Sequence, residues 1–176
     1  MITEKILDEK GIQKTLDQLT QEIINHNKNM NQLILVGIQR GGALLAERIH
    51  SNISELLNIA VPIGSINITL YRDDWTKISY QPILEGTNIT FSIEDKHVLL
   101  IDDVIYTGRT VRAGMDALFD IGRPGHIELA VLVDRGHREL PVQPDYCGKV
   151  INTKRSQTVN VYLKEHDGKD SVVLVS

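Results

Sequence analysis

Apolar residues follow two different spacings along the chain. Residues 3–28 have a helical spacing and predict a first helix, whose apolar positions are Ile12, Leu16, Leu19 and Ile23. Residues 33–38, 98–101 and 127–133 are short continuous apolar runs, which are typical of strands buried on both faces. The two spacings alternate, which predicts an α/β fold with a central, mostly parallel sheet flanked by helices.

Two more helices follow from the same pattern. One begins after Gly41-Gly42, and its apolar positions are Leu45, Ile49, Ile53 and Leu56. The other carries Val111, Met115 and Leu118. It is expected to end at Gly122, because glycine suits a helix C-cap and Pro124 prevents continuation.

The remaining strands are less clearly marked. Residues 61–70 predict a strand, and residues 82–91 a weaker one. Between them, residues 71–80 are polar and charged without a clear period, so we predict a loop. The stretch after residue 133 predicts loops with two short strands near Val159 and Val172. In an open parallel sheet, ligands bind beyond the carboxyl ends of the strands, so the loops after the three buried runs are where chemistry is expected.

Composition narrows the class of protein. The 176 residues make one domain's worth of chain, 1–176, with 41% hydrophobic and 24% charged residues. The single cysteine, Cys147, excludes an internal disulfide. The net charge of −4 lacks the basic excess of a dedicated nucleic-acid binder. The first residues lack the layout of a signal peptide, and no apolar run approaches the roughly 20 residues of a membrane span, so we predict a cytoplasmic protein with no membrane partner.

A pair of carboxylates, Asp102 and Asp103, follows the second buried run. Taken alone, the pair fits a turn in which one carboxylate faces solvent and the other caps the turn. The next residues favour a binding site, because Thr107, Gly108 and Thr110 supply hydroxyls and backbone freedom at a helix start, where free N–H groups bind anions. Ribose 5-phosphate fits this layout, since its phosphate lies a short distance from two vicinal hydroxyls.

Other binding motifs do not match. The sequence has neither the Gly-x-x-x-x-Gly-Lys-Ser/Thr loop of nucleotide hydrolases nor a Gly-x-Gly-x-x-Gly fingerprint. A receiver domain also places paired acids beside a parallel sheet, but there the acids would be expected near the first strand.

Residues 101–110, Ile-Asp-Asp-Val-Ile-Tyr-Thr-Gly-Arg-Thr, resemble the signature of type I phosphoribosyltransferases. The resemblance implies that Asp102 and Asp103 are catalytic residues that bind the ribose hydroxyls of 5-phosphoribosyl-1-pyrophosphate (PRPP). It implies that residues 106–110 wrap the 5-phosphate. The further substrate-binding residues of this segment would be Val104, Ile105, Tyr106, Thr107, Gly108, Arg109 and Thr110.

The resemblance extends along nearly the whole chain. Residues 69–74, 112–117 and 132–141 are similar to the PyrR family of pyrimidine-operon attenuators and uracil phosphoribosyltransferases. This implies a type I phosphoribosyltransferase-like fold with a small hood and a flexible loop, a Mg²⁺ cofactor, and PRPP, uracil and UMP as ligands. Related proteins form dimers and tetramers, so a homodimer or homotetramer is expected.

Two further segments acquire roles through the resemblance. Gln39, Arg40 and Gly41 would form the pyrophosphate-binding loop, although the residues alone also fit a simple strand-to-helix turn. The family usually has a basic residue before the arginine, so Gln39 predicts reduced pyrophosphate affinity. Arg72 lies in a loop that closes over the substrate in related enzymes, and it is the third expected catalytic residue, in contact with pyrophosphate. The alternative for Arg72 is a solvated surface loop.

The third buried run leads into Asp134 and Arg135. Asp134 is expected to hold Mg²⁺ through water, and Arg135 to reach phosphate or the base pocket. The nucleobase is expected to lie against the backbone here and near Val159. The remaining histidines lack metal-ligand spacing, and His137 and Arg138 are expected to be structural or interface residues.

The function implied is uracil phosphoribosyltransferase activity, in which uracil and PRPP give UMP and pyrophosphate in nucleotide salvage. The alternative is a UMP-sensing, RNA-binding attenuator of pyrimidine genes with minor catalysis. In RNA-binding relatives the first helix has a basic face. Here residues 3–28 hold four lysines against five acidic residues, a net charge of −1, which predicts weakened RNA binding because RNA affinity rests on phosphate neutralisation.

Overall fold

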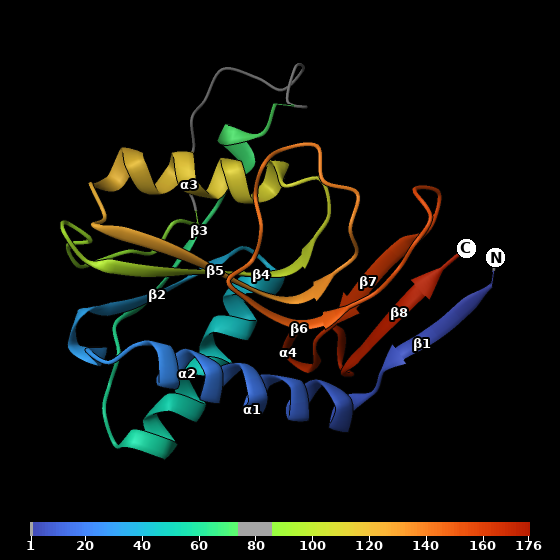
Figure 1. Ribbon diagram of the computed structural model, residues 1–176, viewed down its shortest axis with the longest axis horizontal. Coiled ribbons are helices and arrows are strands. Elements are labelled where there is room, and N and C mark those ends of the chain that lie inside the picture. The colour runs from blue at the N-terminus through green and yellow to red at the C-terminus, as the bar shows by residue number, and fades with distance from the viewer. Residues whose placement is uncertain (1, 74–85) are drawn as a thin grey trace.

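The computed structural model describes residues 2–73 and 86–176. A five-stranded sheet lies at the centre, in the order β3-β2-β4-β5-β6, and every neighbouring pair is parallel. A second, antiparallel sheet of three strands, β1-β8-β7, stands beside it and carries both ends of the chain (Figure 1). The strands are β1 (Thr3–Leu7), β2 (Leu33–Ile38), β3 (Ile63–Ile66), β4 (His97–Ile105), β5 (His126–Asp134), β6 (Tyr146–Val150), β7 (Thr158–Tyr162) and β8 (Ser171–Val175).

Helices cover both faces of the central sheet. Figure 1 shows α1 and α2 on one face and α3 on the other. The helices are α1 (Glu9–His26), α2 (Gly41–Leu57), α3 (Arg109–Ile121) and the short α4 (Lys164–Asp167), with 3-10 turns at η1 (Met30–Gln32) and η2 (Thr69–Tyr71). This arrangement confirms the predicted α/β class, and the small antiparallel sheet together with α4 forms the hood.

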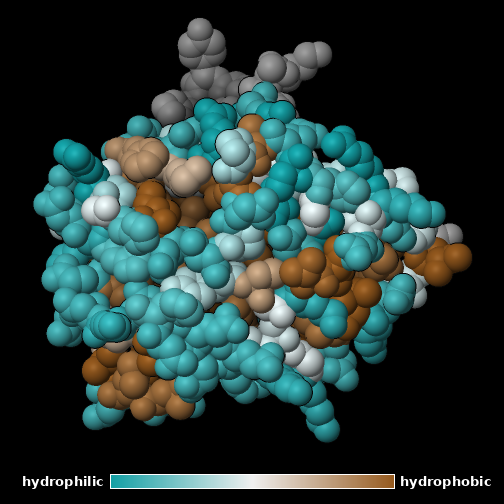
Figure 2. Space-filling view, in the orientation of Figure 1, coloured by the Kyte–Doolittle hydropathy of each residue, from teal (hydrophilic) through white to brown (hydrophobic). Residues whose placement is uncertain are grey.

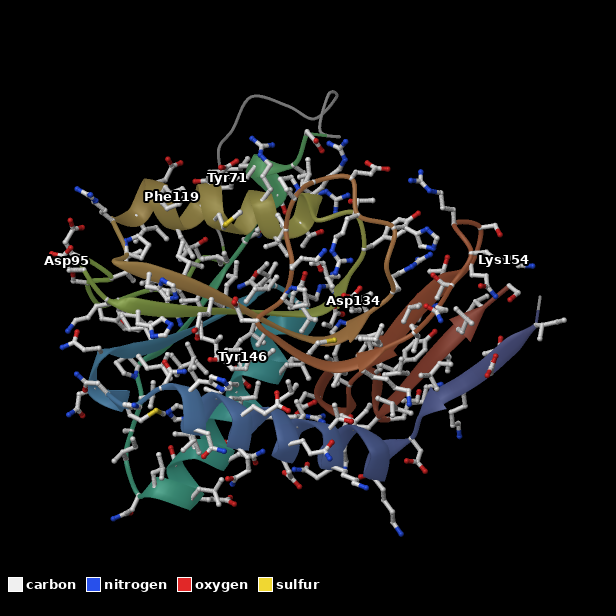
Figure 3. The ribbon with its side chains drawn as sticks, viewed as in Figure 1. Tyr71, Asp95, Phe119, Asp134, Tyr146 and Lys154 are labelled. Carbon is white, nitrogen blue, oxygen red and sulfur yellow. The ribbon has the colours of Figure 1, made fainter. Side chains whose placement is uncertain are left out.

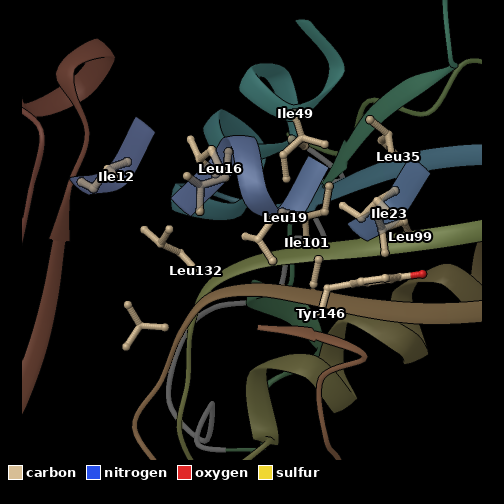
Figure 4. Close-up of a cluster of buried hydrophobic side chains, with 14 of the residues drawn as sticks. Ile12, Leu16, Leu19, Ile23, Leu35, Ile49, Leu99, Ile101, Leu132 and Tyr146 are labelled. Carbon is tan, nitrogen blue, oxygen red and sulfur yellow. The ribbon is translucent and has the colours of Figure 1, made fainter. Parts of the chain in front are cut away.

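The continuous apolar runs follow from burial on both faces. All six residues of β2 are buried. Because successive side chains of a strand point to opposite faces, Leu33 and Leu35 pack in the core under α1 and α2, whereas Ile34 and Val36 pack in the core under α3. Figure 4 shows the first of these cores, in which the apolar side of α1 lies against β4 and β5. The opposite sides of the helices are polar, and the face seen in Figure 2 is mostly hydrophilic.

The prediction of a helix from residue 3 was wrong at its start. Residues 3–7 form β1, which pairs antiparallel with β8. The helix begins only at Glu9, because the Asp8 carboxylate accepts a hydrogen bond from the Gly11 amide at 2.8 Å and caps it. The helical spacing of apolar residues also begins only at Ile12, so the segment before Asp8 had no helical signal of its own.

The predicted strand at 61–70 is shorter than expected. β3 ends at Ile66, and the Asn67 side chain then accepts a hydrogen bond from the Thr69 amide at 2.9 Å, which turns the chain into η2. Of the weaker strand at 82–91, residues 82–85 lie outside the described part. The remainder contributes an isolated antiparallel bridge between Asn88 and Ser65. The flexible loop expected at 71–80 likewise lies outside the described residues from residue 74 onward.

The carboxyl-terminal third contains both confirmed and missed elements. The strands near Val159 and Val172 are β7 and β8. The edge strand β6 was missed, because Tyr146–Val150 has the sequence Tyr-Cys-Gly-Lys-Val, with no apolar run or clean alternation. α3 ends as predicted, with the Gly122 amide donating to the Leu118 carbonyl. None of the helices in the described part of the chain is long and apolar enough to cross a membrane.

Candidate functional site

The polar loops after the buried strands meet at the carboxyl ends of the strands of the central sheet. Ile38 ends β2, Ile105 ends β4 and Asp134 ends β5. Ile105 and Asp134 are register partners in neighbouring parallel strands, so the segments that follow them leave the sheet side by side. This is the edge at which a parallel sheet binds ligands.

Asp102 and Asp103 lie within β4 rather than after it, because the strand continues to Ile105. The side chain of Asp102 is buried, and its Oδ1 accepts the Asp103 amide at 3.0 Å. Asp103 accepts the Val104 amide at 2.7 Å. The alternative in which one carboxylate faces solvent and the other caps a turn does not describe this pair, because both lie within the strand. Both groups are held by the strand itself.

The acid pair is electrostatically costly. Burial, followed by the neighbouring charge of Asp103, raises the pKa of Asp102 well above its ordinary value. Burial also raises the pKa of Asp103. Both carboxyls thus favour their protonated form more than free aspartate does, and a ligand that donates hydrogen bonds to them stabilises the charged form.

A first cavity of about 310 Å³ lies over the segment between β4 and α3. It is lined by Arg72, Asp73 and residues 104–111. Gly108 precedes α3 with a φ of 93°, a left-handed conformation that suits glycine, and the Thr107 hydroxyl accepts the Arg109 amide at a long 3.4 Å. The amides of the first helical turn therefore face the cavity region as an anion-binding group.

Arg109 forms ion pairs with two carboxylates beside this cavity. Its Nε donates to Glu139 at 3.0 Å, and its Nη1 pairs with Asp73. These two carboxylates raise the pKa of Arg109. Arg72, the neighbour of Asp73, lines the same cavity, so the start of the loop that carries it is anchored at the beginning of α3.

A second cavity of about 320 Å³ lies on the other side of Asp103, under the hood. Arg40 and Gly41 line it from the β2–α2 turn, and α4 contributes His166 and Asp167. Nη1 of Arg40 lies 2.6 Å from Nε2 of His166. A Cβ at position 41 would collide with the Asp103 carboxylate, so glycine is what lets this turn approach the acid pair.

Gln39 does not line either cavity as described. Its amide donates to Ser65 Oγ at 3.2 Å and to the Gly86 carbonyl. The side chain therefore ties the β2–α2 turn to the segments around β3. Of the three residues expected to form a pyrophosphate loop, the structure brings Arg40 and Gly41 to Asp103 and turns the Gln39 side chain away.

The residues after β5 are held by protein groups. The Asp134 carboxylate pairs with Arg138 at 2.5 Å and accepts the Gly136 amide at 2.8 Å. Arg135 stacks over the Tyr106 ring at 4.0 Å and donates to the carbonyls of Lys154 and Gln157. Arg138 also donates to the Tyr106 carbonyl at 3.0 Å, which agrees with the structural role expected for it.

Val159 lies in β7 and is buried in the core beneath the hood. Its neighbour two residues on, Val161, lines the second cavity instead. Sequence reasoning missed Val161, His166 and Asp167 as cavity residues. His166 reaches Arg40 across 126 positions of sequence, and no local spacing signals such a contact.

The oxygen donors around the second cavity fit a hard divalent cation. Asp103 and Asp167 both line it, and carboxylate oxygens are the protein ligands that Mg²⁺ accepts. Asp134 and Asp167 are both already engaged, because the oxygens of Asp134 contact Gly136 and Arg138 and those of Asp167 contact Leu163 and His166.

Comparison with known proteins agrees with this geometry. Residues 3–166 match the family described as phosphoribosyl transferase domain. Two curated relatives carry the name bifunctional protein PyrR. That of Pelotomaculum thermopropionicum is 50% identical over 171 residues, covering 97% of this chain and 94% of the relative. That of Clostridioides difficile is 50% identical over 170 residues, covering 97% and 96%.

Solved structures share the fold at lower identity. The hypoxanthine phosphoribosyltransferase of Trypanosoma cruzi superposes with a TM-score of 0.73 at 18% identity, covering 98% of this chain and 95% of that one. A hypoxanthine phosphoribosyltransferase from Staphylococcus aureus gives a TM-score of 0.71 at 22% identity, covering 97% and 90%. At these identities the likeness concerns the fold, which is that of the type I phosphoribosyltransferases. The full-length match at 50% identity goes further, and the chain belongs to the PyrR family of phosphoribosyltransferases.

Proposed function

We propose that this protein transfers the phosphoribosyl group of PRPP to uracil and releases UMP and pyrophosphate. One observation carries the proposal. The carboxylate pair, of which Asp102 is buried and Asp103 lines the second cavity with Arg40, directly precedes the segment that lines the first cavity at the start of α3. PRPP has the matching order of groups, with ribose hydroxyls between a 5-phosphate and a pyrophosphate.

In the proposed complex, the 5-phosphate accepts hydrogen bonds from the first amides of α3 and from Thr107 and Thr110. The ribose hydroxyls donate to Asp102 and Asp103, which raises the charged fraction of both carboxyls. As the bond to pyrophosphate breaks, positive charge grows on the ribose near the carboxylates, and negative charge grows on the leaving group near Arg40. Arg72 lines the first cavity, so its proposed contact with pyrophosphate requires its side chain to reach past the ribose. Catalysis would then rest on positioning and electrostatics, without a protein nucleophile.

Magnesium is the proposed cofactor. When bound, Mg²⁺ neutralises charge on pyrophosphate oxygens. Asp103 and Asp167 are the carboxylates on the second cavity that would hold it. Asp134 would hold the ion through water, because each of its oxygens can accept a second hydrogen bond beside the one from Gly136 or Arg138.

The proposed base site lies beside the Tyr106 ring. The Arg135 guanidinium carbon lies 4.0 Å from the centroid of this ring, and the His137 ring centroid lies 5.8 Å from it. These two contacts fix the orientation of the Tyr106 ring. Uracil offers O2, N3–H and O4, which backbone groups after β5 can read. Val159 is proposed to support this region from within the core, while Val161 lines the second cavity rather than the one beside Tyr106.

The test is conversion of labelled uracil to UMP with PRPP and Mg²⁺. Replacing Asp103→Asn removes one charge beside the ribose and is expected to lower turnover about 100-fold, the size typical of losing one transition-state electrostatic contact. Asp116→Asn is the matched control, because that exposed carboxylate lies on α3 and pairs with Arg112. Equal turnover of Asp103→Asn and the native chain would remove the assigned role.

The second candidate function is RNA-dependent regulation, which the word bifunctional in the relatives' names favours. Several basic residues outside the first helix are paired with carboxylates. Arg112 pairs with Asp116, and Arg155 lies 3.7 Å from Glu139. Figure 3 places Lys154 at the end of the molecule opposite Phe119 of α3. We therefore propose that RNA binding is weakened. Tight, UMP-enhanced retention of a pyrimidine leader RNA on filters would contradict this.

We further propose a role in nucleotide salvage in the cytoplasm, as a homodimer or homotetramer. Exposed apolar side chains at the ends of α2 and α3, Leu56 and Phe119, are available for such contacts. Sedimentation equilibrium with and without UMP measures the state, and a monomer under both conditions would contradict the proposal.

A further inference from the structure

Three potential metal ligands gather at the end of the central sheet opposite the substrate edge. His97 is the first residue of β4, and His126 is the first residue of β5. The two are register partners in neighbouring parallel strands. Glu128 lies two residues after His126, so its side chain points to the same face of the sheet. The ladder therefore holds two imidazoles and one carboxylate together.

The distances are close to those of a coordination site. Nε2 of His97 lies 3.1 Å from Oε2 of Glu128, and Nε2 of His126 lies 3.8 Å from Oε1. One ligand atom from each residue falls within 4.8 Å of the others. Ligand atoms around a tetrahedral Zn²⁺ lie roughly 3.3 Å apart, because Zn–N and Zn–O bonds are about 2.0–2.2 Å long. Small side-chain rotations are enough to close the difference.

A simple ion pair leaves part of this arrangement unexplained. Nε2 of His97 is buried and, within the described part of the chain, has no hydrogen-bond partner of good geometry, although Glu128 is near. The two imidazole rings meet edge to face at 4.9 Å between centroids. A metal ion bound by both imidazoles would satisfy the buried nitrogen.

A second layer of groups orients the carboxylate. The Tyr146 hydroxyl donates to Oε2 of Glu128 at 2.8 Å, and the Asn27 amide donates to that hydroxyl at 3.3 Å. Tyr146 is itself buried between α1 and the sheet (Figures 3 and 4). Outer hydrogen bonds of this kind fix ligand orientation in metal sites.

We propose that His97, His126 and Glu128 bind Zn²⁺, with a fourth position open to water on the exposed side of His126. Nitrogen-rich donors favour Zn²⁺ and similar transition metals over Mg²⁺, which prefers oxygen. Asp103 lies six positions after His97 in β4, a distance of roughly 20 Å at the rise of a strand. The site therefore stabilises the start of β4 and β5 and takes no part in phosphoribosyl transfer.

The test is calorimetric titration of the metal-stripped, full-length protein with ZnCl₂ in excess MgCl₂. One Zn²⁺ per chain is expected, together with an increase in Tm, because an ion bound only by the folded state stabilises it. Co²⁺ in place of Zn²⁺ is expected to give visible d–d absorption from a nitrogen- and oxygen-ligated site.

Substitutions of the proposed ligands test where the Zn²⁺ binds. His126→Ala and Glu128→Gln each remove one ligand and are expected to weaken Zn²⁺ binding more than tenfold, while Tyr146→Phe, which removes an outer hydrogen bond, weakens it about tenfold. His50→Ala is the matched control, because His50 lies in α2 away from the cluster. The proposal is overturned if the native chain binds no Zn²⁺, or if His126→Ala binds it as tightly as His50→Ala does. Unchanged uracil conversion in His126→Ala separates this site from the proposed catalytic one.

Discussion

Two groups of charged side chains in this molecule are built on opposite principles. The buried Asp102 and the partly exposed Asp103 are neighbours in β4, and the hydrogen bonds described for them come from backbone amides and from each other. Arg48 of α2, in contrast, pairs with Asp170 and Glu165 of the hood at 2.7 Å each. The first group is left open for a ligand, and the second is complete within the protein.

The pKa directions express this difference. Burial raises the pKa of Asp102 and Asp103. Hydrogen bonds from Arg48 lower the pKa of Asp170 and Glu165. Stability therefore responds to pH with opposite signs in the two groups, since a raised pKa favours the folded state at low pH and a lowered pKa favours it at high pH. The acid pair destabilises the folded protein at neutral pH, and we expect the protein to keep it because it binds substrate. The Arg48 group holds the hood above that site.

The largest effect on stability is expected from Arg48→Met. The substitution leaves the two acids of the hood without their cation, and Asp170 is the more buried of the two. We expect a loss of about 2 kcal/mol, between the values typical of exposed and of buried pairs. Urea denaturation measures it. The loss should shrink as the pH falls from the ordinary values of 3.8 and 4.5 toward the lowered pKa values of the folded acids, because the unfolded chain then binds protons that the folded acids do not. A loss independent of pH would mean that packing rather than charge is responsible.

Asp102→Asn is expected to increase the free energy of unfolding, by less than Arg48→Met decreases it. The asparagine carbonyl keeps the hydrogen bond from the Asp103 amide and removes a buried charge, so we expect a gain of about 1 kcal/mol at neutral pH. The folded protein binds a proton on Asp102 more readily than the unfolded chain does. The native chain therefore loses stability as the pH rises from 3.8 to the raised pKa, and the advantage of the variant grows over that interval. Thermal melts of both chains across this range measure it, and a variant less stable at neutral pH would contradict the argument.

The same two groups show what a sequence can predict. The acid pair and the helix start after it are contiguous, so residues 102–110 were identifiable as a binding segment from their order alone. The Arg48 group joins positions 117 and 122 residues apart, and no local pattern reveals such pairs. Continuous apolar runs predicted β2, β4 and β5 because both faces of those strands are buried. The edge strands β1 and β6 lacked such runs and were missed for that reason.

The smallest expected change in stability is the difference between removing the charge of Glu165 and removing that of Asp170, the two acids that pair with Arg48. Asp170 accepts both Nη atoms of Arg48 and also the Lys164 amide, at 2.7–2.8 Å, and its side chain is 8% exposed. The Glu165 side chain is 42% exposed, so solvent weakens its share of the interaction. Glu165→Gln is expected to cost under about 0.5 kcal/mol, and Asp170→Asn several times more. A double-mutant cycle of each with Arg48→Met measures the two coupling energies. Equal couplings would show that charge alone, regardless of burial and of the backbone amide, holds the hood on α2.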